Sequence, residues 1–176
     1  MKNLLPLILF LFLSQMNFAQ NVNIPDANLK YKLLTHDPII DINDDDEIQV
    51  SEALAFNGDF DLSNTGFTTQ ISDPTGLEAF VNITGLFLEV QLITSIDVSV
   101  YPFLEQLNLS NNNVSSIDVS QNPNLTLLNL EENNLSEISL NHADLFYLFL
   151  GGNNLTSIDL TSVPSLGNLN LANNNI

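Results

Sequence analysis

The feature that constrains this chain most is a repeat of about 21 residues that fills its second half. Each copy follows the pattern LxxLxLxxNxLxxIDV, with leucine, isoleucine or valine at the apolar positions. The first apolar positions of successive copies are Ile83, Leu104, Leu125, Leu145 and Leu166. The copies are therefore spaced by 21, 21, 20 and 21 residues. A fixed period of this length predicts a stack of similar turns, each of which buries its apolar face against its neighbours.

Both halves of a repeat alternate apolar and other residues, which predicts short strands. In the copy that starts at Leu104, the LxxLxL motif ends at Leu109 and a similar VxxIxV motif follows at 114–119. Alternation of this kind places one face of a strand in the core. The chain is identified as a leucine-rich repeat solenoid, with parallel strands on its concave face and short strands or irregular chain on its convex face. The array resembles the 21-residue bacterial repeats called IRREKO.

An asparagine at the ninth position of the repeat is expected to join neighbouring turns. It occurs at Asn112, Asn133, Asn153 and Asn174, and the degenerate first copy has Gln91 there. A side-chain amide offers both donors and an acceptor to backbone groups that are buried away from water. We therefore assign these asparagines a structural role rather than a ligand-binding role.

The rest of the chain divides into segments of different composition. Helix-start signals near Pro25 and an acidic loop predict a small helical cap ahead of the repeats. The expected segments are a signal peptide at 1–19, the cap at 20–58, a transition at 59–80 and the repeats, four full and one partial, at 81–176. The final repeat stops halfway through its pattern. The chain is therefore expected to be a fragment or truncated product whose longer relatives continue with further repeats and a sorting domain.

The amino-terminal segment predicts export. One basic residue, Lys2, precedes an apolar run of ten residues from Leu4 to Leu13, and Ala19 offers a cleavage point. Ten residues are too few to cross a hydrocarbon core of about 30 Å, which needs about 20. The segment is therefore expected to be a cleaved secretory signal peptide, after which no transmembrane segment remains. The mature protein is expected to be secreted or displayed on the cell surface.

The charge and composition of the chain exclude several kinds of partner and chemistry. The sequence holds 21 acidic residues and three basic ones, which give a net charge of −18. Nucleic acids are bound largely by lysine and arginine side chains that neutralise phosphates, so a nucleic-acid partner is excluded. Cysteine is absent, which excludes thiol chemistry. Only two histidines occur, His36 and His142, so a histidine-based triad or a multi-histidine zinc site is poorly supported.

The acidic loop, DINDDDEIQVSE at Asp41–Glu52, has the spacing of an EF-hand calcium loop. Such loops place oxygen ligands at set positions, end on a bidentate glutamate and need a sharp turn at their sixth residue. The predicted ligands are Asp41, Asn43, Asp45, Glu47 through its carbonyl, Gln49 through water, and Glu52. The sixth residue is Asp46 rather than glycine and the loop is single, so weak Ca²⁺ binding is expected. The alternatives are a metal-free cap of similar shape and a plain acidic loop.

The concave sheet of a repeat solenoid is the surface that such proteins use for binding. The residues that flank the last two apolar positions of LxxLxL are expected to point onto it. Most of them are small or carry amides, but Phe87, Leu127, Tyr147 and Phe149 are large and apolar. Clustered, exposed aromatic side chains mark contact sites, so these four residues form the predicted ligand surface. The alternative is that they stack along the strands without a ligand, since isolated apolar residues are normal on protein surfaces.

These features favour a binding module over an enzyme. Export, repeats and the lack of a catalytic constellation predict a secreted or cell-surface module that binds a protein or a glycan on its concave face. The alternatives are a carboxylate-based secreted hydrolase and a structural component of the cell surface. The periodic acids Asp97, Asp118 and Asp159 are better explained by turn bonding than by catalysis. Over nearly all of residues 22–176 the chain resembles secreted leucine-rich repeat proteins of Gram-negative bacteria, and its cap resembles that of internalin-type surface proteins.

Overall fold

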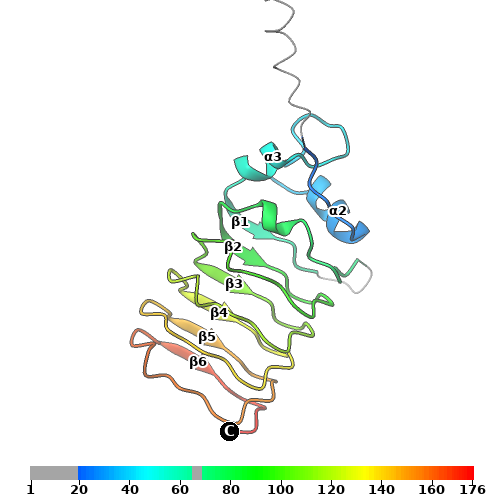
Figure 1. Ribbon diagram of the computed structural model, residues 1–176. Helices are drawn as coiled ribbons and strands as arrows, with labels where there is room; N and C mark the ends of the chain where they lie inside the picture. The colour runs from blue at the N-terminus through cyan, green and yellow to red at the C-terminus, as the bar shows by residue number, and fades with distance from the viewer. Residues whose placement is uncertain (1–19, 65–68) are drawn as a thin grey trace, which may run out of the picture.

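The computed structural model describes residues 20–64 and 69–176, which form a small helical cap followed by one parallel sheet (Figure 1). The predicted signal peptide at 1–19 lies outside the described residues. The cap contains helix α2 (Ala27–Leu34) and helix α3 (Val50–Ala55), and a 3-10 turn, η1 (Leu77–Ala79), follows the first strand. The strands are β1 (Gly58–Asp61), β2 (Ile83–Phe87), β3 (Gln106–Asn108), β4 (Leu127–Asn129), β5 (Tyr147–Phe149) and β6 (Asn168–Asn170). They pair in chain order, each parallel to the next.

The parallel solenoid confirms the predicted fold class. The apolar residue at the centre of each repeat strand lies beside its equivalent in the next turn, in the order Leu86, Leu107, Leu128, Leu148 and Leu169. The sheet also begins one turn before the repeat pattern does. Its first strand, β1, lies almost entirely in the segment that was expected to be a transition, and it pairs with β2. Phe60 of β1 is buried beside Leu86, where it takes the place of a strand leucine.

Burial in this fold comes from the turns on either side of a residue. Leu107, Leu128 and Leu148 are fully buried, whereas Leu169 in the last strand is 42% exposed. The difference arises because β6 has a neighbouring strand on one side only. Complete burial of a leucine side chain contributes about 1.5–3 kcal/mol, so each internal turn is stabilised mainly by its neighbours.

A ladder of side-chain amides joins the turns at the corner where the chain leaves the sheet. In Asn133, Oδ1 accepts a hydrogen bond from the backbone N–H of Val114 at 2.9 Å. Nδ2 of the same residue donates to the carbonyl oxygens of Leu109, Leu130 and Glu131. Val114 and Leu109 belong to the preceding turn, so the amide connects two turns. Equivalent bonds, which confirm the predicted structural role, are made by Asn112, Asn153, Asn174 and Gln91.

The residue before each ladder amide turns the chain through the left-handed region. The φ angles are 59° at Val90, 56° at Asn111, 51° at Glu132, 67° at Gly152 and 57° at Asn173. A residue with a Cβ atom is strained in this conformation, and a β-branched one is strained most. The left-handed conformation recurs in every turn because it directs the next side-chain amide into the core. The ladder bonds offset the strain at the residues other than Gly152.

The convex side is irregular where the sequence alternation predicted a second strand in each turn. No strand is present there within residues 20–64 and 69–176. Neighbouring turns share single backbone bonds on this side, such as that from Asn134 N to Val114 O. In addition, the carboxylate of Asp118 accepts a hydrogen bond from the backbone N–H of Ser120 at 2.8 Å, which forms a local turn in place of an extended strand. Asp97 and Asp159 bond the second residue after them in the same way, as predicted.

Asp26 ties the cap to the solenoid. Its Oδ1 accepts hydrogen bonds from the backbone N–H groups of Asn28 and Leu29 at 2.9 and 3.0 Å, which caps the start of α2. Its Oδ2 accepts hydrogen bonds from the backbone and hydroxyl of Ser72 and from the backbone of Asp73, at 2.9, 3.0 and 3.1 Å. One carboxylate therefore joins a helix to a segment more than 40 residues later in the chain.

Loss of one ladder amide should destabilise the array strongly. Asn133→Ala is expected to lower the free energy of unfolding by roughly 2–4 kcal/mol, because it leaves several buried backbone groups without partners. The matched control is Asn134→Ala, at an adjacent exposed position, for which a change within about 0.5 kcal/mol is expected. Urea denaturation measures both variants. Equal losses would contradict the assigned role of the ladder.

The bonds at Asp26 predict an acid-sensitive cap. Burial raises the pKa of the Asp26 carboxyl, but the hydrogen bonds from Ser72, Leu29 and Asp73 outweigh it and hold the pKa below its usual value of 3.8. A lowered folded-state pKa stabilises the protein above the unfolded pKa, and this contribution is lost as the pH falls through the folded value. Asp26→Asn is therefore expected to cost about 1 kcal/mol at pH 6 and progressively less below pH ~3.8.

Urea denaturation of wild-type protein and Asp26→Asn at several pH values measures this difference. Asp144→Asn, a change at an exposed acid in a turn of the repeats, serves as the control. A cost for Asp26→Asn that stays constant down to pH ~2 would contradict the role of the charged carboxylate.

Candidate functional site

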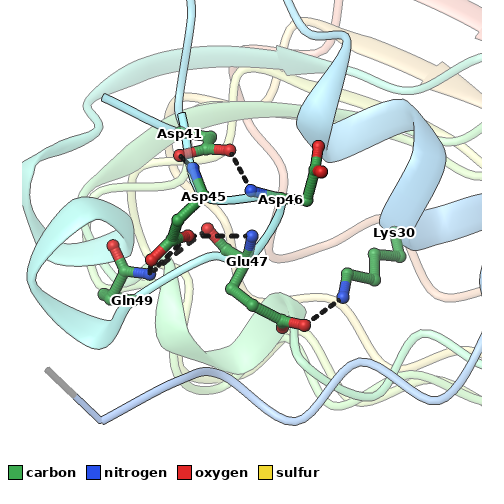
Figure 2. A network of polar contacts seen from close by, with 6 residues as sticks. All are labelled: Lys30, Asp41, Asp45, Asp46, Glu47 and Gln49. Atoms are coloured by element: carbon green, nitrogen blue, oxygen red, sulfur yellow. Dashed lines mark hydrogen bonds and ion pairs between the residues drawn. The ribbon is translucent and has the colours of Figure 1, made fainter. Parts of the chain in front are cut away.

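The acidic loop is bent around the carboxylate of Asp41 (Figure 2). Asp41 Oδ1 accepts hydrogen bonds from the backbone N–H groups of Asp44 and Asp45 at 2.8 and 3.3 Å, and Oδ2 accepts one from Asp46 at 3.0 Å. The backbone adopts positive φ at Asp44 (58°) and Asp46 (60°). The sixth residue of the loop therefore has the conformation that an EF-hand loop requires there, although it is not glycine. Aspartate tolerates this conformation better than most residues do.

Glu52 joins the two ends of the loop. Its Oε1 accepts a hydrogen bond from Ile42 N at 2.8 Å near the start of the loop. Its Oε2 accepts one from Gln49 N at 2.9 Å, which satisfies a free N–H group at the start of α3. The last predicted metal ligand therefore acts as a hydrogen-bond acceptor for the backbone of the loop.

Gln49 contacts two of the other predicted ligands through its side-chain amide (Figure 2). Its side chain is 3% exposed, and its Nε2 donates to both oxygens of Asp45, at 3.0 and 3.1 Å, and to the carbonyl of Glu47 at 3.4 Å. This hydrogen bonding is the main cause that lowers the pKa of the Asp45 carboxyl. Gln49 was expected to act through water, but its amide nitrogen instead contacts two of the predicted ligands directly. The partial positive charge of the amide group offsets some of their negative charge.

The donor set of the loop suits a hard cation by its chemistry, since all the predicted ligands are oxygen atoms. In this conformation the carboxylates of Asp41, Asp45 and Glu52 accept hydrogen bonds from the loop. No three acidic or histidine side chains in residues 20–64 and 69–176 have the arrangement of a metal site. The Glu47 side chain pairs with Lys30 at 2.7 Å, which leaves its backbone carbonyl for the loop interior. The charged groups that could hold a Ca²⁺ ion are the carboxylates of Asp41, Asp45 and Glu52.

The concave face carries two columns of side chains that point away from the core. The first column is Asp59, Gly85, Gln106, Leu127, Tyr147 and Asn168, and the second is Asp61, Phe87, Asn108, Asn129, Phe149 and Asn170. The two columns share the face because alternate residues of a strand point to the same side.

Three of the four residues predicted as a ligand surface lie together. Leu127 is beside Tyr147 on the neighbouring strand, and the ring of Tyr147 lies 6.2 Å from that of Phe149. Phe87 does not join them, because β3 and β4 lie between its strand and β5. Three strand spacings separate it from Phe149 by roughly 14 Å.

Phe146 extends this surface and was not predicted. Its ring lies 4.9 Å from the ring of Tyr147, edge to face, and its side chain is exposed. It covers Gly167 of the next turn, where any Cβ atom would collide with the ring. A large ring followed one turn later by glycine at the same repeat position was a usable signal in the sequence. We call Leu127, Phe146, Tyr147 and Phe149 the aromatic patch.

The charges around the aromatic patch are all negative. The carboxylate of Glu131 lies close to Gly151 and accepts a hydrogen bond from Asn170. Asn170 is the neighbour of Phe149 in the second column. The only lysines of the described residues are Lys30 and Lys32, both in the cap. The repeats therefore present apolar, amide and acidic groups, and they repel anionic ligands.

Comparisons with known proteins identify the fold. No protein-family model and no curated protein matches the chain. The functional domain of InlJ from Listeria monocytogenes matches 68% of this chain at 28% identity, with a TM-score of 0.63. An internalin (inlF) and an internalin C2 (inlC2) from the same organism match 86% and 89% at 23% and 20% identity, with TM-scores of 0.75 and 0.60. The chain spans 26% of the InlJ chain, 44% of inlF and 80% of inlC2. It therefore has the leucine-rich repeat fold of internalins.

The helices of the described residues are too short to cross a membrane. Helix α2 has eight residues and helix α3 has six, and no apolar helix of membrane-spanning length occurs in residues 20–64 and 69–176.

Proposed function

We propose that this chain is a secreted or cell-surface module that binds a protein partner through the aromatic patch. The observation that carries the proposal is the exposure of adjacent aromatic rings on a regular sheet, with Tyr147 41% exposed and Phe146 beside it. Aromatic residues on protein surfaces contribute most of the binding energy in many interfaces. The side-chain amide of Asn129, beside Phe149, supplies a hydrogen-bonding group for a polar rim.

A glycan ligand and a carboxylate-based hydrolase are the competing functions. A glycosidase needs one carboxyl group with a raised pKa to act as general acid. Hydrogen bonds from the following serine or threonine instead lower the pKa of the repeat acids Asp97, Asp118 and Asp159. None of these three acids therefore has the raised pKa that such a general acid needs. A glycan remains an outcome of the binding test.

Arrays of immobilised extracellular proteins and glycans, probed with the purified chain, test this function. For a ligand bound at the patch, the double variant Tyr147→Ser, Phe149→Ser is expected to raise the Kd by at least about 30-fold, because truncation of a central aromatic costs about 2 kcal/mol or more. The matched control is Phe103→Ser, which removes an exposed ring (53%) outside the sheet. A ligand bound equally by all three proteins would contradict a site at the patch, and a glycan ligand would replace the protein partner.

We also propose that the acidic loop binds Ca²⁺ weakly and that the ion stabilises the cap. The positive φ angles of Asp44 and Asp46 support this role, as does the curvature of the loop around Asp41. Four consecutive acids at 44–47 repel one another, and the Glu47 side chain alone has a lysine partner. A divalent ion would remove more of this repulsion than the Gln49 amide does.

Calcium should therefore raise the melting temperature of the wild-type protein. With a Kd of about 10⁻⁴–10⁻³ M, 10 mM Ca²⁺ at ten or more times Kd is expected to add about 1.4 kcal/mol or more. Asp45→Asn and Glu52→Gln should abolish the rise, because each removes a charged ligand. Asp144→Asn should keep it, since this acid lies in the repeats. Differential scanning calorimetry with and without Ca²⁺ measures the shift, and an unchanged wild-type melting temperature would exclude calcium binding.

A change at Gln49 separates the calcium-bound cap from the metal-free one. Gln49→Ala removes the amide that contacts Asp45 and is expected to lower the melting temperature without metal. If Ca²⁺ takes the place of this amide, the ion should restore the stability of Gln49→Ala and raise its melting temperature more than that of wild type. A loss that Ca²⁺ does not restore would favour the metal-free cap.

A further inference from the structure

A groove of about 620 Å³ lies between η1 and the convex segment of the next turn. It is lined by the apolar side chains of Leu77, Ile96 and Val100 and by the acids Asp73, Glu78 and Asp97. Its volume lies in the range of small-molecule sites, about 300–1,000 Å³. None of its residues belongs to the aromatic patch or the acidic loop, so it is a separate feature of the molecule.

Tyr101 supplies a polar group to this groove without a partner in the protein. The residue is 1% exposed and lines the groove. Its hydroxyl has no hydrogen bond to any residue in 20–64 or 69–176, and protein atoms do not enclose it fully. The small exposed part of Tyr101 therefore includes its hydroxyl, and the residue lines the groove. In the next two turns the same position bonds the preceding turn, through Asn122 Nδ2 to Val98 O at 2.9 Å and through His142 Nε2, which lies 3.0 Å from Val119 O.

The carboxyl groups of the groove have no cationic partner in the described part of the chain. Glu78 Oε2 accepts a hydrogen bond from Gly76 N at 2.7 Å, and its Oε1 accepts none from the described residues. Lys30 is paired with Glu47, and Lys32 donates to the carbonyl oxygens of Leu62 and Ser63. Residues 33–176 contain no lysine or arginine. No lysine of residues 20–64 and 69–176 therefore balances the negative charge of the groove.

The surroundings of Tyr101 keep its phenol protonated. Burial raises the pKa of its phenol, and the nearby charges of Glu78 and Asp97 raise it further. The hydroxyl is therefore neutral at physiological pH, and it offers lone pairs to a donor as well as its own proton.

We propose that the groove binds a small alkylammonium ligand. The ammonium group donates hydrogen bonds to the hydroxyl oxygen of Tyr101 and to the carboxylates of Glu78 and Asp97, and the alkyl chain contacts Leu77 and Val100. An ammonium group carries three donors, which matches one neutral and two anionic acceptors. The negative charges disfavour an anion, and a neutral alcohol gains no charge-assisted hydrogen bond.

Titration of the ¹⁵N-labelled chain with three ligands of equal length tests the proposal. The probes are pentylammonium, 1-pentanol and pentanoate at pH 7, followed by the backbone amide signals of Gly76 and Ser99, which bond Glu78 and Asp97. Pentylammonium is expected to shift these signals saturably, with 1-pentanol at least about tenfold weaker and pentanoate without effect. Equal binding of the amine and the alcohol would overturn the proposal, as would no saturation by pentylammonium up to about 50 mM.

Two variants test whether Tyr101 and Asp97 contact the ammonium group. Tyr101→Phe removes only the hydroxyl and Asp97→Asn removes one charge, and each is expected to weaken pentylammonium binding about tenfold. The matched control is Asp118→Asn, because Asp118 forms the same turn with Ser120 one repeat later and does not line the groove. Its binding should equal that of wild type. Unchanged binding in Tyr101→Phe and Asp97→Asn, with both variants folded by their NMR spectra, would overturn the proposal.

Discussion

The whole solenoid depends on one interaction, the hydrogen bonding of a buried side-chain amide to backbone groups of two successive turns. At the corner after each strand the backbone bends away from the sheet, and its N–H and C=O groups lose their strand partners. Asn133 supplies one acceptor and two donors at this point, and its bonds to Val114 and Leu109 fix the position of the preceding turn. Because buried polar groups without partners are costly, the ladder determines which turns can stack and in which register.

The uniform register explains where the functional groups gather. Equivalent positions of successive turns lie side by side, so an exposed residue in one turn contacts the equivalent residue of the next. Leu127 and Tyr147 meet in this way on the concave face. At the other side of the turn, Asp97 and Tyr101 line the groove beside η1. In the cap, where the repeat does not extend, carboxylates take over the role of the amides, and Asp26 and Asp41 each gather several backbone N–H groups.

Sequence periodicity predicted the fold because each apolar position and each ladder asparagine recurs in every copy. In the cap, the EF-hand spacing of the acidic loop predicted the turn at Asp46, because such a loop requires a positive φ angle at its sixth residue. Strand β1 was missed as part of the sheet because the sequence around it does not follow the full repeat pattern. The convex strands were predicted from alternation alone, which does not account for competition from aspartate turns such as that of Asp118. Spacing also places residues on a face without showing which large side chains meet there, so Phe87 was grouped with residues three strands away.

The absence of cationic side chains from the repeats has a consequence for how this protein meets other molecules. Two copies repel each other, whereas a partner with a basic surface is drawn toward the solenoid before any contact forms. Such attraction acts on the rate of association more than on the lifetime of the complex. It extends only over the Debye length, about 8 Å at physiological ionic strength and about 3 Å at 1 M salt. The salinity of the surroundings would thus set how fast a basic partner is captured, while the apolar contacts set how long it stays.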